Sequence, residues 1–451
     1  MPIRRSATLF GLLALVATIV GAGAWVSFRA ASLWMTYDVS AADAASGALR
    51  DTTLAIARNL VSLYDPTPPL KARLAPDERD LRRYKPIEEA WRAGEVAPLA
   101  NGLRLELIEA RNERIVRSPW KFGYQPYDEP RIHELRQRYH LEDIMASAPT
   151  EFEGMVRLRH WARTRFNRAD YQPLMPNFDA LEILNRNDRN QGEPYLFGGH
   201  FDPCHFFQLL YAQVLVSLGH QARLVSIGQG MTEVWSNQYR KWVMMDAELD
   251  HHLERNGLPL NMLELSMLYH SQDHSGVIVS SSPRRPGEEN PTLPDLHVEA
   301  LNAETVISWF TGPLEVTELR NDWMTNHYFR GHPARSEAAT LVFDASGTGK
   351  ASYQQRLRPH TSRKEDLYWT LNQSTILVDP DVSGGFRVAF DTETPNFDYF
   401  EVVTDGVMTK LATSSMPWQV HAGTNELRVR SVNKFGVRGI ESAVKIRSRV
   451  P

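Results

Sequence analysis

The stretch DPCHFFQLLYAQVLVSLGHQARLVSIGQGMTEVWSNQYRKWVMMD, residues 202–246, decides the fold of the middle of this chain. It opens with a helix-start pattern, in which Asp202 suits the N-cap and Pro203 the first helical position. Cys204 then falls in the first turn, where the positive end of the helix dipole favours a thiolate over a thiol. The stretch therefore predicts a cysteine prepared for nucleophilic chemistry.

The remainder of the stretch predicts one helix followed by three strands. Apolar residues recur at helical spacing as far as Leu218, and Gly219 stands where helices commonly end. Three β-prone runs then follow, at 221–227, 232–236 and 241–246. This order of elements indicates an α+β unit.

The residues before the cysteine add two further helices to this unit. Thr150 to Glu153 has the form of a capping box, and apolar residues recur at helical spacing from Phe152 to Phe166. A second helix is expected to begin near Asp179 and to run through Leu184. A Gly-rich turn then leads towards the cysteine.

Taken in order, these features resemble the transglutaminase-like family over residues 150–271. The residues that carry the resemblance are Cys204, Leu218-Gly219, Ala222-Arg223-Leu224-Val225, Glu233-Val234-Trp235 and Trp242-Val243-Met244-Met245-Asp246. The resemblance implies a papain-like α+β core with a Cys-His-Asp triad. In such a triad the histidine takes the thiol proton and the aspartate orients the histidine.

The chain departs from this triad at its middle position. Cys204 and Asp246 match the first and last positions, but Gln229 stands where the resemblance expects histidine. Glutamine forms hydrogen bonds but does not accept a proton near neutral pH, so it cannot act as general base. No other histidine lies between His220 and His251 to take this place.

Three hypotheses for this departure stay open. The first is a pseudoenzyme that keeps the cleft for binding peptide or amine groups. The second is an active cysteine enzyme with a relocated base, for which His200 and His205 are candidates. The third is an architectural domain in which Cys204 is an inert, buried residue.

The sequence predicts neither a metal nor a cofactor. His200 and His205 near the cysteine, and His251-His252 after Asp246, invite a metal site, but no close-set ligand motif supports one. His270 and His274 are four residues apart, and a solvated polar pair is the simpler interpretation.

The N-terminal residues predict a membrane anchor or a signal peptide. Arg4 and Arg5 precede an uncharged, mostly apolar run from Ala7 to Phe28, which is long enough to span a bilayer. Ala22-Gly23-Ala24 resembles a cleavage site, so a removed signal peptide stays an alternative to an anchor at residues 7–28. In both cases the rest of the chain is expected outside the cytoplasm, in the periplasm or at the cell surface.

Composition shifts divide the chain into five regions. They are a membrane anchor or signal peptide at 1–30, a stalk with a small α/β region at 31–145, a transglutaminase-like domain at 146–276, a linker and connecting segment at 277–335, and a β-sandwich at 336–451. In the second region Leu103, Leu105 and Leu107 alternate with polar residues. With Ile115 and Val116 they predict a small hairpin.

The last region resembles fibronectin type III and related immunoglobulin-like modules. Short β-prone runs at 385–390, 397–403 and 426–432 are separated by turns, which is typical of an antiparallel sandwich. Trp369 and Phe397 are expected to pack in the core of this sandwich. The whole chain is thus expected to be an α+β transglutaminase-like core plus an all-β sandwich, behind an N-terminal transmembrane helix.

Charge and cysteine content limit the partners. The 50 basic and 54 acidic residues form no block of like charge, which argues against a nucleic-acid partner. One cysteine in 451 residues cannot form an internal disulfide.

The sequence therefore predicts an envelope protein whose degenerate cleft of Cys204, Gln229 and Asp246 binds or processes peptide or protein amide groups. The alternative is a non-catalytic structural or adhesive module whose domains contact protein or envelope glycan.

Overall fold

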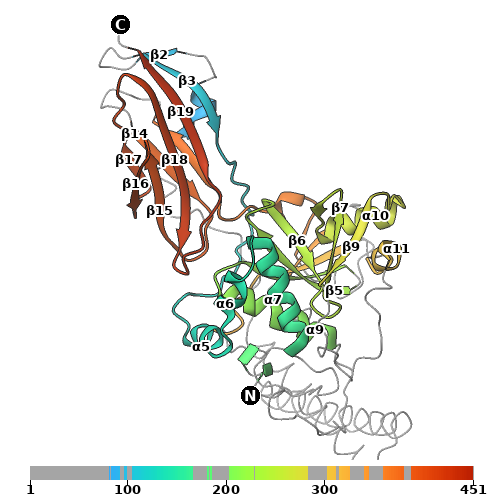
Figure 1. The fold of residues 1–451 in the computed structure, drawn as a ribbon. Helices are drawn as coiled ribbons and strands as arrows, with labels where there is room; N and C mark the ends of the chain where they lie inside the picture. Colours follow the sequence, from blue (N-terminus) through green and yellow to red (C-terminus); the bar gives the residue numbers. More distant parts are fainter. Residues whose placement is uncertain are drawn as a thin grey trace, which may run out of the picture.

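The structure is a computed structural model that describes residues 81, 83–91, 96–98, 104–165, 180–181, 183–184, 203–227, 229–282, 302–310, 314–325, 340–344, 359–379 and 387–449. The expected membrane run at 7–28 lies outside these residues. What is described is a mixed α and β chain with two parts, an α/β body and an elongated β-sandwich (Figure 1).

A six-stranded sheet, counted over the described residues, forms the centre of the α/β body. Its strands, in spatial order, are β12 (His360–Thr361), β11 (Thr340–Asp344), β10 (Leu314–Glu318), β4 (Ala222–Ile227), β5 (Gln229–Ser236) and β6 (Lys241–Met245). Strands β4, β5 and β6 are consecutive and antiparallel, and they correspond to the three runs predicted at 221–227, 232–236 and 241–246. Strand β12 pairs with β11 in parallel.

Each face of this sheet is covered by a different set of helices. One face packs against α5 (Pro130–Tyr139), α6 (Leu141–Ala146), α7 (Glu151–Arg165) and α9 (Pro203–Ser217). The other packs against α10 (Met262–Ser271) and α11 (Ala303–Ile307), beside a small sheet of β8 (Leu258–Pro259), β7 (His251–Arg255) and β9 (Val277–Ser281). Side chains alternate between the faces along a strand, so in β4 Leu224 joins the α9 side and Val225 the α10 side.

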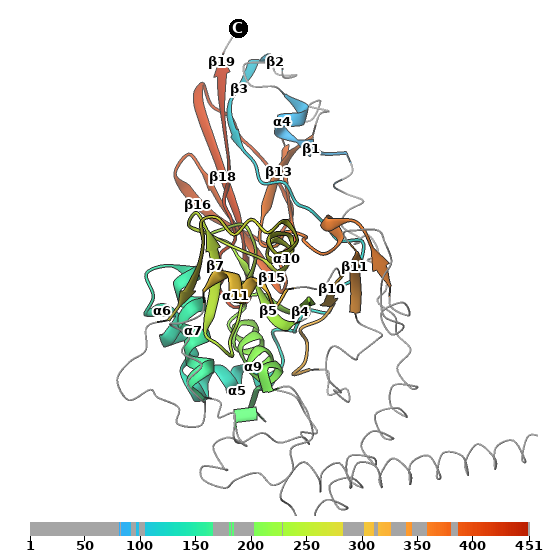
Figure 2. The same cartoon turned by 90° about the vertical axis from the view of Figure 1, so that its right-hand side faces the viewer.

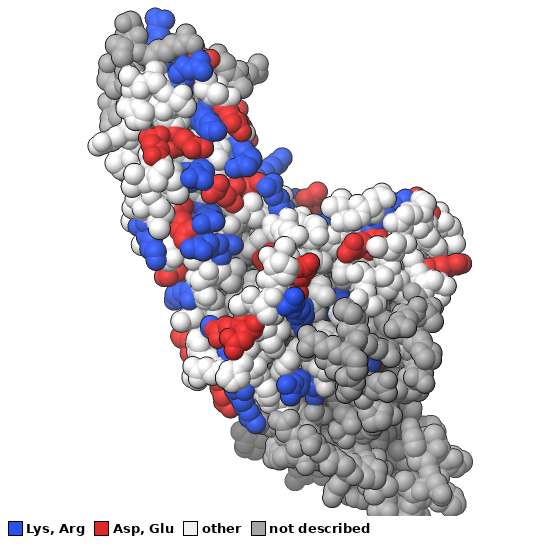
Figure 3. Space-filling view, in the orientation of Figure 1, with Lys and Arg blue, Asp and Glu red and all other residues white. Residues whose placement is uncertain are grey.

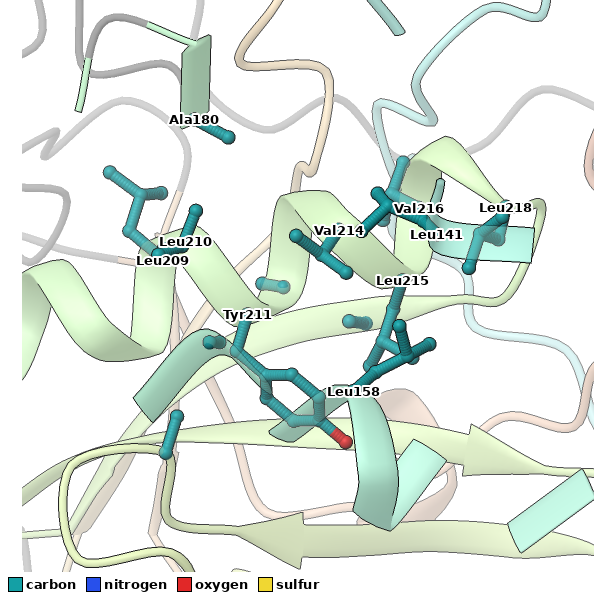
Figure 4. Packing of buried hydrophobic residues seen from close by; sticks show 14 of the residues in the cluster. Leu141, Leu158, Ala180, Leu209, Leu210, Tyr211, Val214, Leu215, Val216 and Leu218 are labelled. Carbon is teal, nitrogen blue, oxygen red and sulfur yellow. The ribbon is translucent and has the colours of Figure 1, made fainter. Parts of the chain in front are cut away.

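Helix α9 is buried on all sides because its sequence is apolar on all sides. Every residue from Phe207 to Ser217 is buried, including the polar Gln208 and Gln213. Figure 4 shows Tyr211 and Leu215 of α9 beside Leu158 of α7. The Tyr211 hydroxyl donates to the Met155 carbonyl, 3.0 Å away, so this buried hydroxyl has a hydrogen-bond partner.

The second part of the molecule is a sandwich of two antiparallel sheets. One contains β1 (Lys85–Pro86), β13 (Ser374–Val378), β14 (Arg387–Thr392) and β17 (Ser415–Pro417). The other contains β16 (Val407–Leu411), β15 (Phe397–Thr404), β18 (Gly423–Asn433), β19 (Ser442–Arg449), β3 (Arg104–Arg111) and β2 (Val96–Pro98). Their inner faces share one core, to which the short helix α4 (Ile87–Ala90) contributes Ile87.

The sandwich includes residues from well before the cysteine, which differs from the expected division of the chain. Leu105 and Leu107 do alternate on β3, but this strand pairs with β19 and β2, not with residues 115–116. The reason is burial, because both leucines enter the sandwich core beside Ile446. Strand β3 also covers the edge that β19 would otherwise expose.

The segment after residue 336 likewise serves both parts of the molecule. Strands β11 and β12 extend the central sheet of the α/β body. A 3₁₀ helix, η5 (Lys364–Asp366), leads to Trp369, whose ring lies 5.4 Å from that of Trp242 on β6. Trp369 is therefore buried, but in the α/β body and not in the sandwich core where it was expected. Phe397, in contrast, packs against the sandwich core.

The two parts contact each other through the turn between β18 and β19. In both ribbon views the sandwich stands at one end of the α/β body (Figure 1, Figure 2). Asn433 donates from Nδ2 to the carbonyl of Gly219, 3.0 Å away, at the turn that ends α9. The Phe435 ring packs edge-on against Tyr127, with centroids 4.9 Å apart. Gly219 thus lies directly beneath the sandwich.

We expect Gly219→Ala to destabilise this contact. Gly219 has φ +83°, and a Cβ there would lie 2.5 Å from Cβ of Phe435. The substitution combines the cost of a left-handed backbone, about 1–2 kcal/mol, with a clash of about 1–3 kcal/mol. Gly257→Ala is the matched control, because Gly257 has φ +76° but open space around it. Urea unfolding should show a clearly larger loss of unfolding free energy for Gly219→Ala than for Gly257→Ala. Equal losses would show that the Phe435 side chain moves aside without cost.

Candidate active site

The predicted cysteine lies at the start of the central helix. Helix α9 begins at Pro203, so Cys204 stands in its first turn, as the sequence predicts. The backbone of Cys204 and of Gln229 is described, whereas both side chains, and all of Asp202, lie outside the described part. The position of the site therefore follows from the backbone and from the side chains around it.

Gln208 ties the first turns of α9 to the sheet. Its Nε2 donates to Oδ1 of Asp246 over 2.9 Å, and its Oε1 accepts from the backbone N–H of Thr232 over 3.2 Å. The same oxygen accepts from the Ala247 N–H over 3.3 Å. Gln208 is completely buried, so these bonds satisfy both ends of its amide and fix α9 against β5 and the end of β6.

This contact places the three predicted site residues at one end of the sheet. Cys204 precedes Gln208 by four residues and so lies on the same face of α9. Helix α9 ends close to Ala222, which pairs with Val234, so its first turn lies towards the opposite end of β5. That end is where β5 begins, at Gln229. Asp246 directly follows β6, beside Gln208.

Asp246 is held rigidly by hydrogen bonds. Besides the bond from Gln208, its Oδ1 accepts from the N–H groups of Glu248 and Leu249, 2.8 and 3.1 Å away. Its backbone exchanges both hydrogen bonds with His251, at 2.9 and 3.1 Å. A buried carboxylate fixed in this way can orient an imidazole, which is the role that the resemblance gives to this position.

His251 is the titratable group that the structure brings beside Asp246. Its Nδ1 lies 3.7 Å from Oδ2 of Asp246, and its side chain is 0% exposed. Among the described residues, neither ring nitrogen meets strict hydrogen-bond geometry, although the ring interacts with the backbone of Leu249, which raises its pKa. Burial lowers the pKa of His251, and the Asp246 carboxylate opposes this shift. The imidazole is therefore neutral at neutral pH and can accept a proton.

Sequence reasoning considered His251 only as a metal ligand. The hairpin that turns the chain back on itself after Asp246 is what pairs the two residues, as an isolated antiparallel bridge. The aspartates Asp246 and Asp250, at the two ends of the turn, were the available signal for it.

A buried arginine supports this hairpin from the side of α7. Arg159 donates from Nε to Oδ1 of Asp250 over 2.8 Å, and its Nη1 lies 2.9 Å from Nδ1 of His252. His160 Nδ1 lies 2.7 Å from the second oxygen of Asp250. Arg159 and His160 hold the pKa of Asp250 below its usual range although burial acts in the opposite sense. The cluster positions the hairpin that carries His251.

A second buried ion pair supports the sheet from the opposite face. Arg223 on β4 donates from Nη2 to Oε2 of Glu233 on β5 over 2.6 Å, and both side chains are fully buried. The guanidinium lies over the ring of Trp242 at 4.3 Å and bonds the Leu367 carbonyl. Glu233 also accepts from the N–H of Met262. Both residues belong to the pattern behind the family resemblance, and the structure gives them a scaffolding role.

Nothing in the described part of the chain tests the other histidines expected near the cysteine. His200 lies outside the described residues, as does the side chain of His205. Over the described part of the chain, no group of three or more histidine, cysteine, aspartate or glutamate side chains could hold a metal ion. Within the same part, no helix is long and apolar enough to cross a membrane.

Comparisons of the chain with protein-family models, with curated proteins and with solved structures find no match. The function must therefore be argued from the residues and their geometry.

Proposed function

We propose that this chain is an envelope protein with a degenerate transglutaminase-like cleft, formed by Cys204, Gln229 and Asp246, that binds or processes peptide or protein amide groups. The fold proposed for the core is the papain-like α+β arrangement, and the sandwich is of the fibronectin type III or immunoglobulin-like kind. The run at residues 7–28 would hold these parts outside the cytoplasm, as an anchor or as a cleaved signal peptide.

One observation carries the proposal, namely the bond from Gln208 to Asp246. It joins the face of α9 that bears Cys204 to the carboxylate that follows β6. The helix dipole favours a thiolate at a cysteine in the first turn of a helix, whereas the carboxylate that Gln208 binds one turn later is suited to orienting a base. Attack of the thiolate on an amide carbonyl would form a C–S bond, release an amine and leave a thioester for water or another amine.

The sandwich supports the second part of the proposal by its strand order. Strands β13, β14 and β17 are neighbours in one sheet, and β16, β15, β18 and β19 are neighbours in the other, an order that resembles immunoglobulin-like sandwiches. Basic and acidic side chains are interspersed along the face of the sandwich in Figure 3. Glu401, for example, pairs with Arg430 at 2.6 Å. Such a face suits protein or glycan contacts better than nucleic acid.

The rival proposal is a structural or adhesive module without catalysis. It is supported by the lack of a histidine at position 229 and by the dense packing of α9. The two proposals differ over Cys204, because a cleft requires an accessible thiol and an architectural core requires an inert one.

The rate of Cys204 alkylation by iodoacetamide across pH separates these proposals. The full-length chain contains one cysteine, so incorporation of the reagent reports on Cys204 alone, and Cys204→Ser gives the background. A cleft predicts alkylation of the folded protein with a midpoint well below the ordinary thiol value of about 8.5. Alkylation that occurs only after unfolding in urea would reject the cleft and favour the architectural module.

A further inference from the structure

We propose that the β-sandwich is a clasp that joins both ends of the α/β body, so that the two parts unfold as one cooperative unit. The proposal goes beyond the proposed function, because it gives the sandwich the role of holding the α/β body and does not depend on Cys204. It rests on the path of the chain, on the pairing of the two segments that connect the parts, and on the contact at the β18–β19 turn.

The path of the chain makes the α/β body an insertion in the sandwich. Among the described strands, β1, β2 and β3 of the sandwich end by Arg111, and its remaining strands begin with Ser374. The strands of the central sheet all lie between these limits. Strand β3 pairs with β19, from Arg104 opposite Arg449 to Arg111 opposite Ala443. The sandwich therefore needs chain from both sides of the α/β body, and its formation joins the two ends of that body.

The two segments that connect the parts, residues 112–118 and 369–373, are bonded to each other. The Val116 N–H donates to Oγ1 of Thr370 over 2.9 Å. The Thr370 N–H donates in return to the Val116 carbonyl, also over 2.9 Å. The connection between the parts is thus a two-stranded neck, in which each segment supports the other.

Side chains of this neck also bond to each part of the molecule. At the sandwich end, Oδ1 of Asn112 accepts from the Ile376 N–H over 2.7 Å, and Nδ2 of Asn112 donates to the Ile376 carbonyl over 2.8 Å. At the other end, Glu113 pairs with Arg240 in the turn between β5 and β6, with 2.6 Å between oxygen and nitrogen. Arg240 is half exposed, so this ion pair contributes little stability and serves mainly to fix the direction of the neck.

The sandwich is bonded to the α/β body a second time, away from the neck, through Asn433 and Asn396. Oδ1 of Asn396, the residue before β15, accepts from the Tyr127 N–H over 3.0 Å. Its Nδ2 donates to the Gln125 carbonyl over 2.9 Å. In the β18–β19 turn, the ring of Phe435 packs against the core of the α/β body. Separation of the parts would break these bonds and expose the Phe435 ring to water.

These contacts couple the unfolding of one part to the unfolding of the other. Domains open independently when one linker joins them and few contacts cross between them. Here the chain crosses twice, the two crossings pair, and the β18–β19 turn adds a second attachment. Loss of the sandwich would release the neck and remove Phe435 from the α/β body. The turn is also committed to this internal contact, so any partner of the sandwich must bind another surface.

Hydrogen exchange of the most protected amides in the two parts of the full-length chain tests the clasp. Ile446 on β19 is completely buried in the sandwich core, and Ile227 on β4 is 1% exposed in a core of the α/β body. Ile446→Val and Ile227→Val each remove one buried methylene group and should speed global opening by about 2- to 12-fold. In one cooperative unit, each variant speeds exchange in β5 and in β18 by the same factor.

Val407→Ala is the control for these two variants. Val407 is 69% exposed on the edge strand β16, so its truncation should leave exchange unchanged in both parts. Exchange that speeds up only in the part that carries the substitution would show two independent domains and would overturn the clasp. If both valine variants leave exchange unchanged, Ile446→Ala and Ile227→Ala repeat the comparison with a larger cavity. Exchange does not involve the cysteine, so its outcome is independent of the alkylation test.

Discussion

Glu233→Gln should lower the free energy of unfolding by about 3–5 kcal/mol, the largest loss that we expect from a single conservative change. Arg223 and Glu233 are both fully buried, and the Arg223 Nε and Nη2 groups donate to the same carboxylate oxygen over 3.0 and 2.6 Å. Glutamine keeps the shape of the side chain but leaves the guanidinium without a counter-charge. The rings of Trp242 and Trp369 remain, at 4.3 and 5.0 Å, and compensate only in part.

The matched control for Glu233→Gln is Asp273→Asn. Asp273 pairs with Arg255 at the same 2.6 Å separation of nitrogen and oxygen, but at the surface. Exposed pairs contribute little because water and salt screen them, so this variant should unfold at nearly the wild-type urea concentration. Chemical denaturation monitored by tryptophan fluorescence measures both variants. A small and equal effect of the two substitutions would show that the buried pair does not hold the sheet.

Acidification should destabilise the protein through His252. Burial lowers the pKa of this imidazole to about 4, and the nearby Arg159 acts in the same sense. At neutral pH the side chain is uncharged in the folded and unfolded states. Below about pH 6.5 the His252 imidazole binds a proton in the unfolded chain but stays uncharged in the folded chain. The unfolding free energy should therefore fall between pH 6.5 and 4, by up to roughly 3 kcal/mol from this residue.

The comparison of His252→Gln with wild type isolates this contribution. Glutamine can hydrogen-bond but does not titrate, so the variant should lose less stability over the same pH range. Burial also lowers the pKa of His220 to about 4, so the unfolding free energy of both proteins should still depend on pH through His220. His421→Gln, a change at an exposed side chain, is the control. Equal slopes for wild type and His252→Gln would mean that the imidazole is solvated in the folded protein.

The elements nearest to the cysteine were predictable because their signals are local. Pro203 and the apolar period up to Leu218 indicate α9, and short β-prone runs indicate β4, β5 and β6. The bonds that secure the site were less predictable. Gln208 reads as one polar residue in an apolar helix, and its partners Thr232 and Asp246 lie 24 and 38 residues away along the chain. Nothing in helical spacing identifies such partners.

The sequence by itself determined that α9, β4, β5 and β6 form in this order, that Cys204 lies in the first turn of a helix, and that position 229 carries no base, whereas β9, α11 and β10 lie in the segment that it assigned to a linker. Only the tertiary structure decided that β3 joins β19, that Trp369 packs on Trp242, and that Asp246 meets His251. The physical reason is the range of the forces involved. Backbone propensity and side-chain period act within a few residues, whereas burial selects among distant partners, and many pairings of strands satisfy the same alternation.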